Sequence, residues 1–370
     1  MRLHNMKNLQ KYTAENTKLF SYAGSKAKYQ AKFNDLHSQV SVKQVNTYIE
    51  AFGGTLASMF HNLQNIQAQR IIVNDINPRL VNMYCQIKEN PQEVVEVFTL
   101  FEDTFQSHIP KRFKGKGLVR DKAEREKYLA HLRDFYKEVR AFYNSSDFNT
   151  SQNAGALLFL LQHNFNGLYN EAKKTGNFNI SFNWNMKKIS VEKIITNLYN
   201  LHSFFTEKNV VIENLDTKSL IQKYSNTYDT LIYLDPPYIN SEVGYSSEQT
   251  TNYNTVEAHL ELLQSCKVFD YVMYSNNFNE TINSKFKQSV EFSRTNGIAQ
   301  NKQDKSKREI LGFINNTYQI MPTVKFLLEE LELNALRNIP KVQTLLSANN
   351  TSIICPPHFL YEKNIDKEVA

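Results

Sequence analysis

Residues 231–240, LIYLDPPYIN, join an apolar run to an acid, two prolines and a tyrosine. Proline has no amide hydrogen and cannot continue a central strand, so Pro236 and Pro237 direct the chain out of a sheet here. The Asp235 carboxylate and the Pro236 carbonyl then offer two hydrogen-bond acceptors beside the ring of Tyr238. Two acceptors and a ring fit an exocyclic amino group on a flat heterocycle, although an ordinary proline turn uses the same residues.

Three upstream segments, FSYAGSK, EAFGG and NDIN, carry residues suited to a ligand that has a carboxylate, a ribose and a ring. Lys26 can meet a carboxylate, and Tyr22 can meet a flat ring. Gly54 lets the backbone approach a ligand closely, and Asp75 occupies the position from which an acid binds ribose hydroxyls. Each has an ordinary alternative: a surface lysine, a glycine turn, or an aspartate that caps a helix.

The elements that must position these residues alternate along the chain. Helical patterns such as 78–90 and 255–266 separate short β-rich runs, which predicts an α/β fold with a mainly parallel sheet and helices on both faces. Ligands of such sheets bind beyond the carboxyl ends of the strands. The predicted strands are 46–52, 70–75, 209–216, 230–235, 271–276, 289–294 and 309–315.

One long segment, 95–205, interrupts this alternation with charged and aromatic helical stretches. It predicts a helical lobe inserted between the second and third strands. The expected organisation is therefore an α/β domain in two parts, 15–94 and 206–320, around a lobe at 95–205. Residues 321–370 form a C-terminal extension to which the sequence assigns no role.

The charge is concentrated in one part of the chain. The protein has 370 residues and a net charge of +6, and segment 111–140 holds eleven Lys or Arg against five Asp or Glu. A basic surface suits a polyanion, whereas spaced ion pairs on a solvated helix face are the alternative. The opening KRFKGKG has no acid, so we expect Lys111, Arg112 and Lys114 to contact phosphates.

Cysteine content and hydropathy indicate a cytoplasmic protein. Cys85, Cys266 and Cys355 are far apart and form neither a disulfide framework nor a metal-ligand pattern, so we expect no metal. The N-terminus lacks the apolar core of a signal peptide, and the longest apolar run, ALLFLL, is too short to span a bilayer.

The ordered motifs from about residue 20 to 315 resemble those of the Dam-like, α-class adenine-N6 DNA methyltransferases. The motifs are FSYAGSK, EAFGG, NDIN, NFNGLYN, GNFNISF, DPPY, YSN, RTNG and REILGFIN. The resemblance implies a Rossmann-like S-adenosylmethionine-dependent methyltransferase sheet with a late antiparallel strand. It also implies that the inserted helical segment is a target-recognition lobe and that the acceptor is an adenine in DNA.

The resemblance implies a role for each motif residue. The expected catalytic residues are Asp235, Pro236, Pro237 and Tyr238. The expected cofactor-binding residues are Tyr22, Lys26, Glu50, Phe52, Gly54, Asp75 and Asp235. The expected DNA-binding residues are Asn166, Leu168 and Asn170, together with the basic residues named above. Hydrogen bonds from the adenine amino group to Asp235 and the Pro236 carbonyl would localise the lone pair of its nitrogen for in-line attack on the methyl group. The target adenine would flip out of the duplex.

The chain departs from the family pattern in three places, one of which is Phe178-Asn179-Ile180-Ser181 in place of the family's FNVP. Only Gly54 matches the glycine-rich F-x-G-x-G turn, because Leu56 stands where the second glycine is expected. GATC-specific relatives place an arginine at the position of Asn170, and arginine reads guanine with two hydrogen bonds. We therefore expect a target other than GATC. Segment 241–254 either closes over the flipped base or forms a surface loop.

Other functions share parts of this pattern. An RNA-adenine, N4-cytosine or protein-glutamine methyltransferase uses a related P-P-Y rim, and a catalytically inactive DNA-binding subunit would keep the fold. The expected partners are double-stranded DNA and a cognate restriction endonuclease, with no membrane. We expect a monomer or weak dimer that acts as a restriction–modification, phage or solitary methylase.

Overall fold

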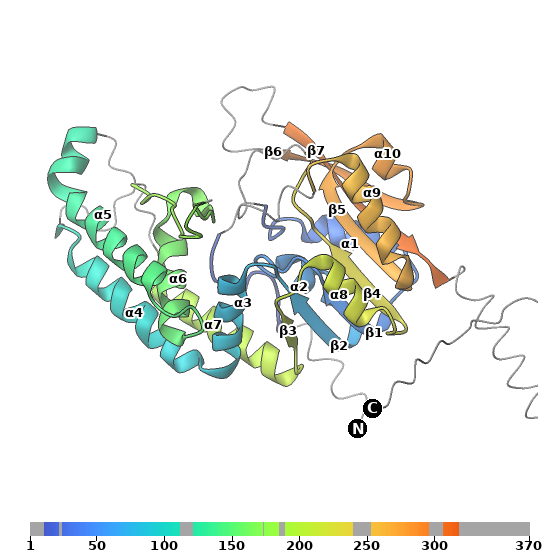
Figure 1. Cartoon of the computed structure of the whole chain (residues 1–370), viewed down its shortest axis with the longest axis horizontal. Coiled ribbons are helices and arrows are strands. Elements are labelled where there is room, and N and C mark those ends of the chain that lie inside the picture. The colour runs from blue at the N-terminus through green and yellow to red at the C-terminus, as the bar shows by residue number, and fades with distance from the viewer. Residues whose placement is uncertain are drawn as a thin grey trace, which may run out of the picture. The chain divides into compact units, whose positions relative to one another are not determined.

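The computed structural model describes residues 11–21, 24–111, 121–172, 174–184, 189–239, 253–295 and 306–317 (Figure 1). The predictions for Tyr22, Arg112 and Lys114 lie outside these residues, as do nearly all of loop 241–254 and the extension 321–370. The described residues belong to one compact unit. The domain boundaries at 94/95 and 205/206 stay predictions.

A seven-stranded sheet in the order β3-β2-β1-β4-β5-β7-β6 forms the centre of the described chain. Each strand corresponds to a predicted β-rich run, which confirms the α/β fold. The strands are β1 (Gln44–Glu50), β2 (Gln67–Asn74), β3 (Val211–Glu213), β4 (Thr230–Leu234), β5 (Tyr271–Asn277), β6 (Gln288–Thr295) and β7 (Ser306–Asn315).

The strand register brings the carboxyl ends of the central strands together. Glu50 at the end of β1 lies opposite Val73 of β2 and Tyr233 of β4 in parallel pairings. Asp75 and Asp235, each of which directly follows its strand, therefore lie at one edge of the sheet. This carboxyl edge is where ligands of parallel sheets bind.

Strand β7 runs opposite to its neighbours, since it pairs antiparallel with both β5 and β6. This confirms the late antiparallel strand that the sequence resemblance implied. The reversal has a geometric consequence, because the beginning of β7 lies at the carboxyl edge of the parallel strands. Glu309, near that beginning, pairs with Asn277 at the end of β5.

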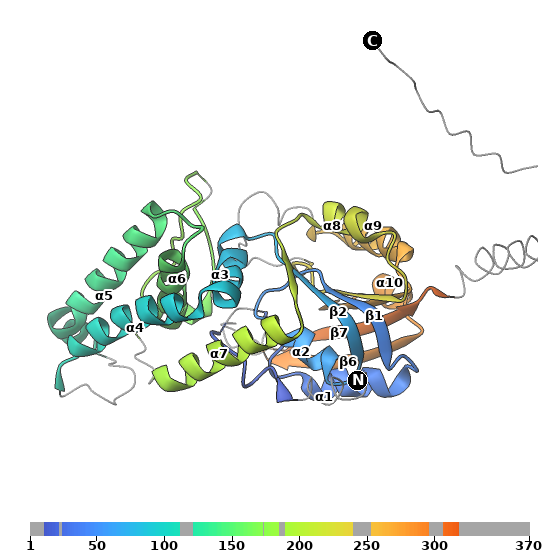
Figure 2. The same ribbon diagram turned by 90° about the horizontal axis from the view of Figure 1, so that it is seen from below.

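Helices cover both faces of the sheet, because successive strand side chains point to opposite sides. Ile49, Ile232 and Val272 share a core with α8, α9 and α10, whereas Tyr48, Leu231 and Met273 share one with α1 and α2. Figure 2 shows the two sets of helices on either side of the strands. These helices are α1 (Gln30–Gln39), α2 (Ala57–Leu63), α8 (Thr217–Tyr224), α9 (Val256–Ser265) and α10 (Glu280–Asn283).

Most of the described residues of segment 95–205 lie in helices, and its role as a separate lobe stays a prediction. Its helices are α4 (Pro91–Ser107), α5 (Lys122–Ser145), α6 (Ser151–His163) and α7 (Val191–Glu207), and α3 (Pro78–Glu89) precedes them (Figure 1). The run ALLFLL lies in α6, where residues 156–161 are all buried. An apolar run inside a short helix that is buried on all sides fills a protein core. Among the described residues, no helix is long and apolar enough to cross a membrane.

Candidate active site

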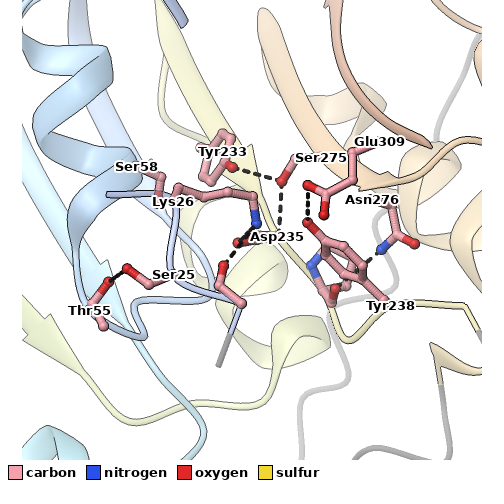
Figure 3. A network of polar contacts seen from close by, with 12 residues as sticks. Ser25, Lys26, Thr55, Ser58, Tyr233, Asp235, Tyr238, Ser275, Asn276 and Glu309 are labelled. Atoms are coloured by element: carbon pink, nitrogen blue, oxygen red, sulfur yellow. Dashed lines mark hydrogen bonds and ion pairs between the residues drawn. The ribbon is translucent and has the colours of Figure 1, made fainter. Parts of the chain in front are cut away.

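The Asp235 carboxylate lies where three segments of the chain meet. Its Oδ2 accepts a hydrogen bond from Lys26 Nζ at 2.5 Å, and its Oδ1 accepts one from Ser275 Oγ at 2.9 Å (Figure 3). Lys26 comes from the loop before α1, and Ser275 comes from β5. The carboxylate is therefore fixed from both sides at the carboxyl edge of the sheet.

Lys26 is a buried lysine, with only 2% of its side chain exposed. Besides Asp235, its ammonium group donates to the carbonyl oxygen of Gly24 at 3.3 Å and lies 5.0 Å from the ring centroid of Tyr238. The backbone carbonyl of Lys26 bonds with His61 Nε2 at 2.9 Å. The surface-lysine alternative is therefore wrong, and the buried charge is compensated by Asp235.

Ser275 and Tyr233 support Asp235 from the interior of the sheet. The hydroxyl of Tyr233 lies 2.7 Å from Ser275 Oγ, and Tyr233 is fully buried. Burial raises the pKa of Tyr233 well above its ordinary value, so its hydroxyl stays protonated. No role was predicted for these residues, although the YSN motif was the signal in the sequence that could have identified Ser275.

Asn276 fixes the Pro236 carbonyl. Its Nδ2 donates to Pro236 O at 3.2 Å, while its Oδ1 accepts from the backbone amide of Ile239 at 3.1 Å. These two bonds attach the proline turn to the end of β5. A carbonyl oxygen has two lone pairs, so the bond from Asn276 leaves capacity for a second donor such as an amino group.

Tyr238 is held through its hydroxyl, which donates to Glu309 Oε2 at 3.0 Å. Glu309 is buried on β7, with 1% of its surface exposed. In Figure 3 the hydroxyl end of Tyr238 is directed at Glu309, beside Asn276. The ring of Tyr238 thus lies close to Lys26, the partner of Asp235, and its predicted role as a platform stays a prediction.

Asp75 joins the ends of β1 and β2. Its Oδ2 accepts from the backbone amide of Gly54 at 2.9 Å, and its Oδ1 accepts from that of Asn77 at 2.9 Å. Burial raises the pKa of Asp75 above its ordinary value. Asn77, not Asp75, caps α3, because the Asn77 side chain accepts from the amides of the first turn. The capping alternative for Asp75 is therefore wrong.

The turn after β1 leaves space at Gly54. Gly54 has φ +48°, and a Cβ placed there would meet no atom within 4 Å. Leu56, two residues later, also has a left-handed backbone, with φ +62°, and its side chain is buried. Glycine adopts this conformation without steric cost, so burial of the Leu56 side chain compensates for the departure from the family motif.

The other residues predicted from this strand end lie in different environments. Glu50 is fully buried, and the hydroxyls of Tyr48 and Ser58 donate to its two carboxyl oxygens. Burial raises the pKa of Glu50 to about 8. Phe52 is half-buried and meets the ring of Tyr253 edge-on, with 5.8 Å between centroids. The predicted contacts of Glu50 and Phe52 with a cofactor stay predictions.

The predicted base-contacting segment follows α6 and doubles back on itself. An antiparallel bridge joins Asn164 with Phe182. Asn166 is exposed and has φ +56°, whereas Leu168 and Asn170 are half-buried. Asn170 Nδ2 donates to Asn179 Oδ1 at 3.3 Å. The turn thus presents amide side chains to solvent.

Ion pairs on α5 favour the solvated-face interpretation for that helix. Arg133 pairs with Glu126 and Asp134, each at 3.1 Å, and Lys137 pairs with Asp134 at 3.3 Å. Lys111, before this helix, is exposed. Its predicted contact with phosphates stays a prediction.

The chain is similar to known DNA methyltransferases. The chain is 25% identical over 237 residues to the type II methyltransferase M.MjaIII of Methanocaldococcus jannaschii, covering 63% of this chain and 73% of the relative. It is 24% identical to the type II methyltransferase M1.LlaDCHI of Lactococcus lactis subsp. cremoris, covering 69% and 82%. It is 28% identical to the DNA adenine methylase of Vibrio cholerae, covering 47% and 51%.

The family match extends over most of the chain. Residues 22–303 match the family described as D12 class N6 adenine-specific DNA methyltransferase. This range includes the DPPY turn, the recognition segment and the ends of the central strands. The match to an adenine-specific DNA methyltransferase family argues against the RNA, cytosine, protein and non-catalytic alternatives. The chain belongs to the D12 class of N6 adenine-specific DNA methyltransferases and is a site-specific enzyme that methylates adenine in DNA.

Proposed function

We propose that the methyl donor is S-adenosylmethionine and that the DPPY turn holds the amino group of a flipped adenine during transfer. One observation carries this proposal: the Asp235 carboxylate and the Pro236 carbonyl are both fixed by side chains of β5, beside the ring of Tyr238. Pro237 completes the turn. The arrangement supplies two acceptors for the two amino hydrogens of adenine.

The Asp235 carboxylate and the Pro236 carbonyl assist attack by the adenine amino nitrogen. The lone pair of the adenine amino nitrogen is delocalised into the ring, which makes the nitrogen a poor nucleophile. Hydrogen bonds to Asp235 and Pro236 O favour a pyramidal nitrogen and stabilise the positive charge that develops on it. The proton that the nitrogen loses is held first by Asp235. Because both acceptors are fixed before the base arrives, little reorganisation is needed.

The residues at the ends of β1 and β2 fit the methyl donor. S-adenosylmethionine supplies an electrophilic methyl group on a positively charged sulfur. The Asp75 carboxylate lies at the strand end from which acids bind ribose hydroxyls, and the open space at Gly54 lets the donor approach the backbone. Tyr22, Glu50 and Phe52 complete the proposed cofactor set.

Lys26 has a double role in this proposal. Its ammonium carries three hydrogens, and it donates to Asp235 and to the carbonyl of Gly24. A further acceptor, such as the carboxylate of the methyl donor, fits beside these two. Lys26 would then link the donor to the residue that holds the adenine amino group.

The target adenine must leave the duplex, because a stacked and paired base cannot present its amino group to a buried carboxylate. We propose that Tyr238 stacks on the flipped base. Asn166, Leu168 and Asn170 contact bases, and Lys111, Arg112 and Lys114 contact phosphates without reading sequence.

The biological setting is part of the proposal. Two of the relatives are named as type II methyltransferases. We propose that this chain modifies a site other than GATC, as a cytoplasmic monomer or weak dimer. A cognate restriction endonuclease would act on the same site.

Binding of the methyl donor tests the proposed cofactor site without relying on turnover. Isothermal titration of the purified protein with S-adenosylmethionine should give a dissociation constant that rises about tenfold in Asp75→Ala, since hydrogen bonds to a charged group are lost. Asp134→Ala, a change in an exposed acid on α5, serves as the control. Equal affinity of Asp75→Ala and wild type would contradict the assignment.

A further inference from the structure

Strand β7 contributes a carboxylate to the edge of the sheet where the DPPY turn lies. Glu309 pairs with Asn277 of β5 and with Phe292 of β6, so it lies between two strands at their carboxyl ends. Only 1% of its surface is exposed. Burying a carboxylate is unfavourable unless hydrogen bonds compensate, so this position calls for a specific partner.

That partner is Tyr238. Its hydroxyl donates to Glu309 Oε2 at 3.0 Å, across 71 residues of sequence. A hydrogen bond to a carboxylate is stronger than one between neutral groups. The bond fixes the far end of the ring, while the backbone turn fixes its near end.

Fixing both ends of the ring fixes its long axis, which runs from Cβ to the hydroxyl oxygen. The side chain of tyrosine has two torsions, and a turn alone restrains only where the side chain begins. The hydroxyl contact restrains the rotation that would swing the ring away from Asp235. A phenylalanine at position 238 would keep the stacking surface and lose this restraint.

We propose that Glu309 is a positioning residue that fixes the direction of the Tyr238 side chain, and so the place of its ring, for stacking on the flipped adenine. This inference rests on the proposed role of Tyr238 as the platform for the base. Glu309 acts through Tyr238 and touches neither the base nor the methyl donor. It therefore affects the DNA side of the reaction and leaves binding of the donor unchanged.

Variants on both sides of the hydrogen bond test this inference. Methylation is measured with the full chain and a duplex that contains the target site in unmethylated form. The steady-state constants for DNA and for S-adenosylmethionine are determined separately. We expect Glu309→Ala and Tyr238→Phe each to lower kcat/KM for DNA about tenfold, with KM for the donor within about twofold of wild type. Glu309→Gln should recover most of the loss, because its amide oxygen still accepts from Tyr238.

The double variant separates positioning from a structural role. If Glu309 acts through the hydroxyl of Tyr238, the variant with both Glu309→Ala and Tyr238→Phe should be no worse than either single variant. Losses that multiply to about 100-fold, or an equal rise in KM for both substrates, would overturn the inference. If Glu309→Ala does not fold, the effect of Glu309→Gln on kcat/KM for DNA is measured in the wild-type and Tyr238→Phe backgrounds. A clear loss of kcat/KM that is equal in both backgrounds overturns the inference.

Two further variants keep the inference distinct from the function on which it rests. Glu291→Gln changes an exposed carboxylate on the neighbouring strand β6 and should match wild type. The fluorescence of 2-aminopurine at the target position reports base flipping. If Tyr238→Ala flips and methylates as wild type does, the platform role of Tyr238 itself fails. If Tyr238→Ala fails while Tyr238→Phe and Glu309→Ala behave as wild type, only the positioning role of Glu309 is overturned.

Discussion

The DPPY turn and the base-contacting segment use opposite structural strategies. At the DPPY turn, buried side chains of the neighbouring strand β5 fix both acceptors, as Ser275 fixes Asp235 and Asn276 fixes Pro236. In the base-contacting segment, Asn166 is exposed and Asn170 is half-buried, with its amide bonded to another asparagine. In our proposal the chemistry therefore rests on the sheet, whereas sequence reading rests on a turn that substitutions can alter at small cost.

The predicted base-contacting segment packs on residues 19–21, which lead to Lys26. Gly167 has φ +65°, and a Cβ on it would lie 2.4 Å from the carbonyl oxygen of Ser21. Gln162 Nε2 donates to Leu19 O at 2.8 Å nearby. The recognition turn therefore packs directly on the segment that leads to Lys26. A side chain at position 167 would push the recognition turn away from Ser21.

Among the residues that support Asp235, the largest effect should come from Lys26→Ala. This change leaves the half-buried Asp235 carboxylate without its cation, and it removes the proposed contact with the methyl donor. We expect kcat/KM to fall about 100-fold, as measured by incorporation of labelled methyl groups into DNA. A loss of less than about threefold would show that the ion pair is not needed, and the contrast between the two regions would fail.

Glu50→Gln tests whether Glu50, at the end of β1, is a neutral acid in the folded protein. The pKa of Glu50 is raised to about 8 by burial, so its neutral form stabilises the fold fully below its ordinary pKa of 4.5. That contribution decreases as the pH rises from 4.5 to about 8, because in this range Glu50 is ionised in the unfolded chain and neutral in the folded protein. Glutamine cannot ionise, so the stability of Glu50→Gln relative to wild type should rise by roughly 3 kcal/mol between pH 5 and 8.

Chemical denaturation at several pH values measures this difference directly. The pH dependence, rather than the absolute stability, is diagnostic, because replacing the carboxyl group has a constant effect at every pH. A parallel pair of stability curves for the two proteins would show that Glu50 is ionised in the folded state.

Asn276→Ala should have a smaller effect on catalysis. The Pro236 carbonyl would lose the bond that aims it, while Asp235 would keep both of its partners. We expect kcat to fall about tenfold, with the affinity for S-adenosylmethionine unchanged. An unaltered kcat would show that the proline turn holds its carbonyl without help from β5.

The smallest effect on rate should come from Asn170→Ala in the recognition turn. Asparagine reads bases through its amide, and its loss should relax the preference at one position of the site, with kcat within about twofold of wild type. Modified-base sequencing of DNA from cells that express the variant measures the preference. An unaltered target sequence would indicate that Asn170 only shapes the turn.

Sequence patterns predicted the strands and the edge of the sheet that carries the site. Alternating β-rich and helical runs were sufficient because the central strands are apolar and end in polar residues such as Asp75 and Asp235. The short β3 was predicted too long, since the backbone amide of Leu215 bonds with the side chain of Asn74 instead of a strand. Local side-chain hydrogen bonds of this kind leave no periodic signal.

Pairings between distant residues could not be predicted. Lys26 and Asp235 are 209 residues apart, and only the fold makes Lys26 a partner of the catalytic acid instead of a surface residue. Glu309 lies in a recognised motif, but its contact with Tyr238 depends on the reversed direction of β7. Residue types and spacing identify the candidate groups, whereas strand order decides which of them meet.

Methyl transfer by Asp235→Asn tests the central claim most directly. Asparagine has a similar shape but lacks the charge and one of the two acceptor oxygens, so it cannot pair with the Lys26 cation and hold the adenine amino group at the same time. In a single-turnover experiment with saturating S-adenosylmethionine and DNA, we expect the rate of N6-methyladenine formation to fall about 1,000-fold, while the thermal unfolding transition stays cooperative. A rate within tenfold of wild type in a folded Asp235→Asn protein would contradict the account.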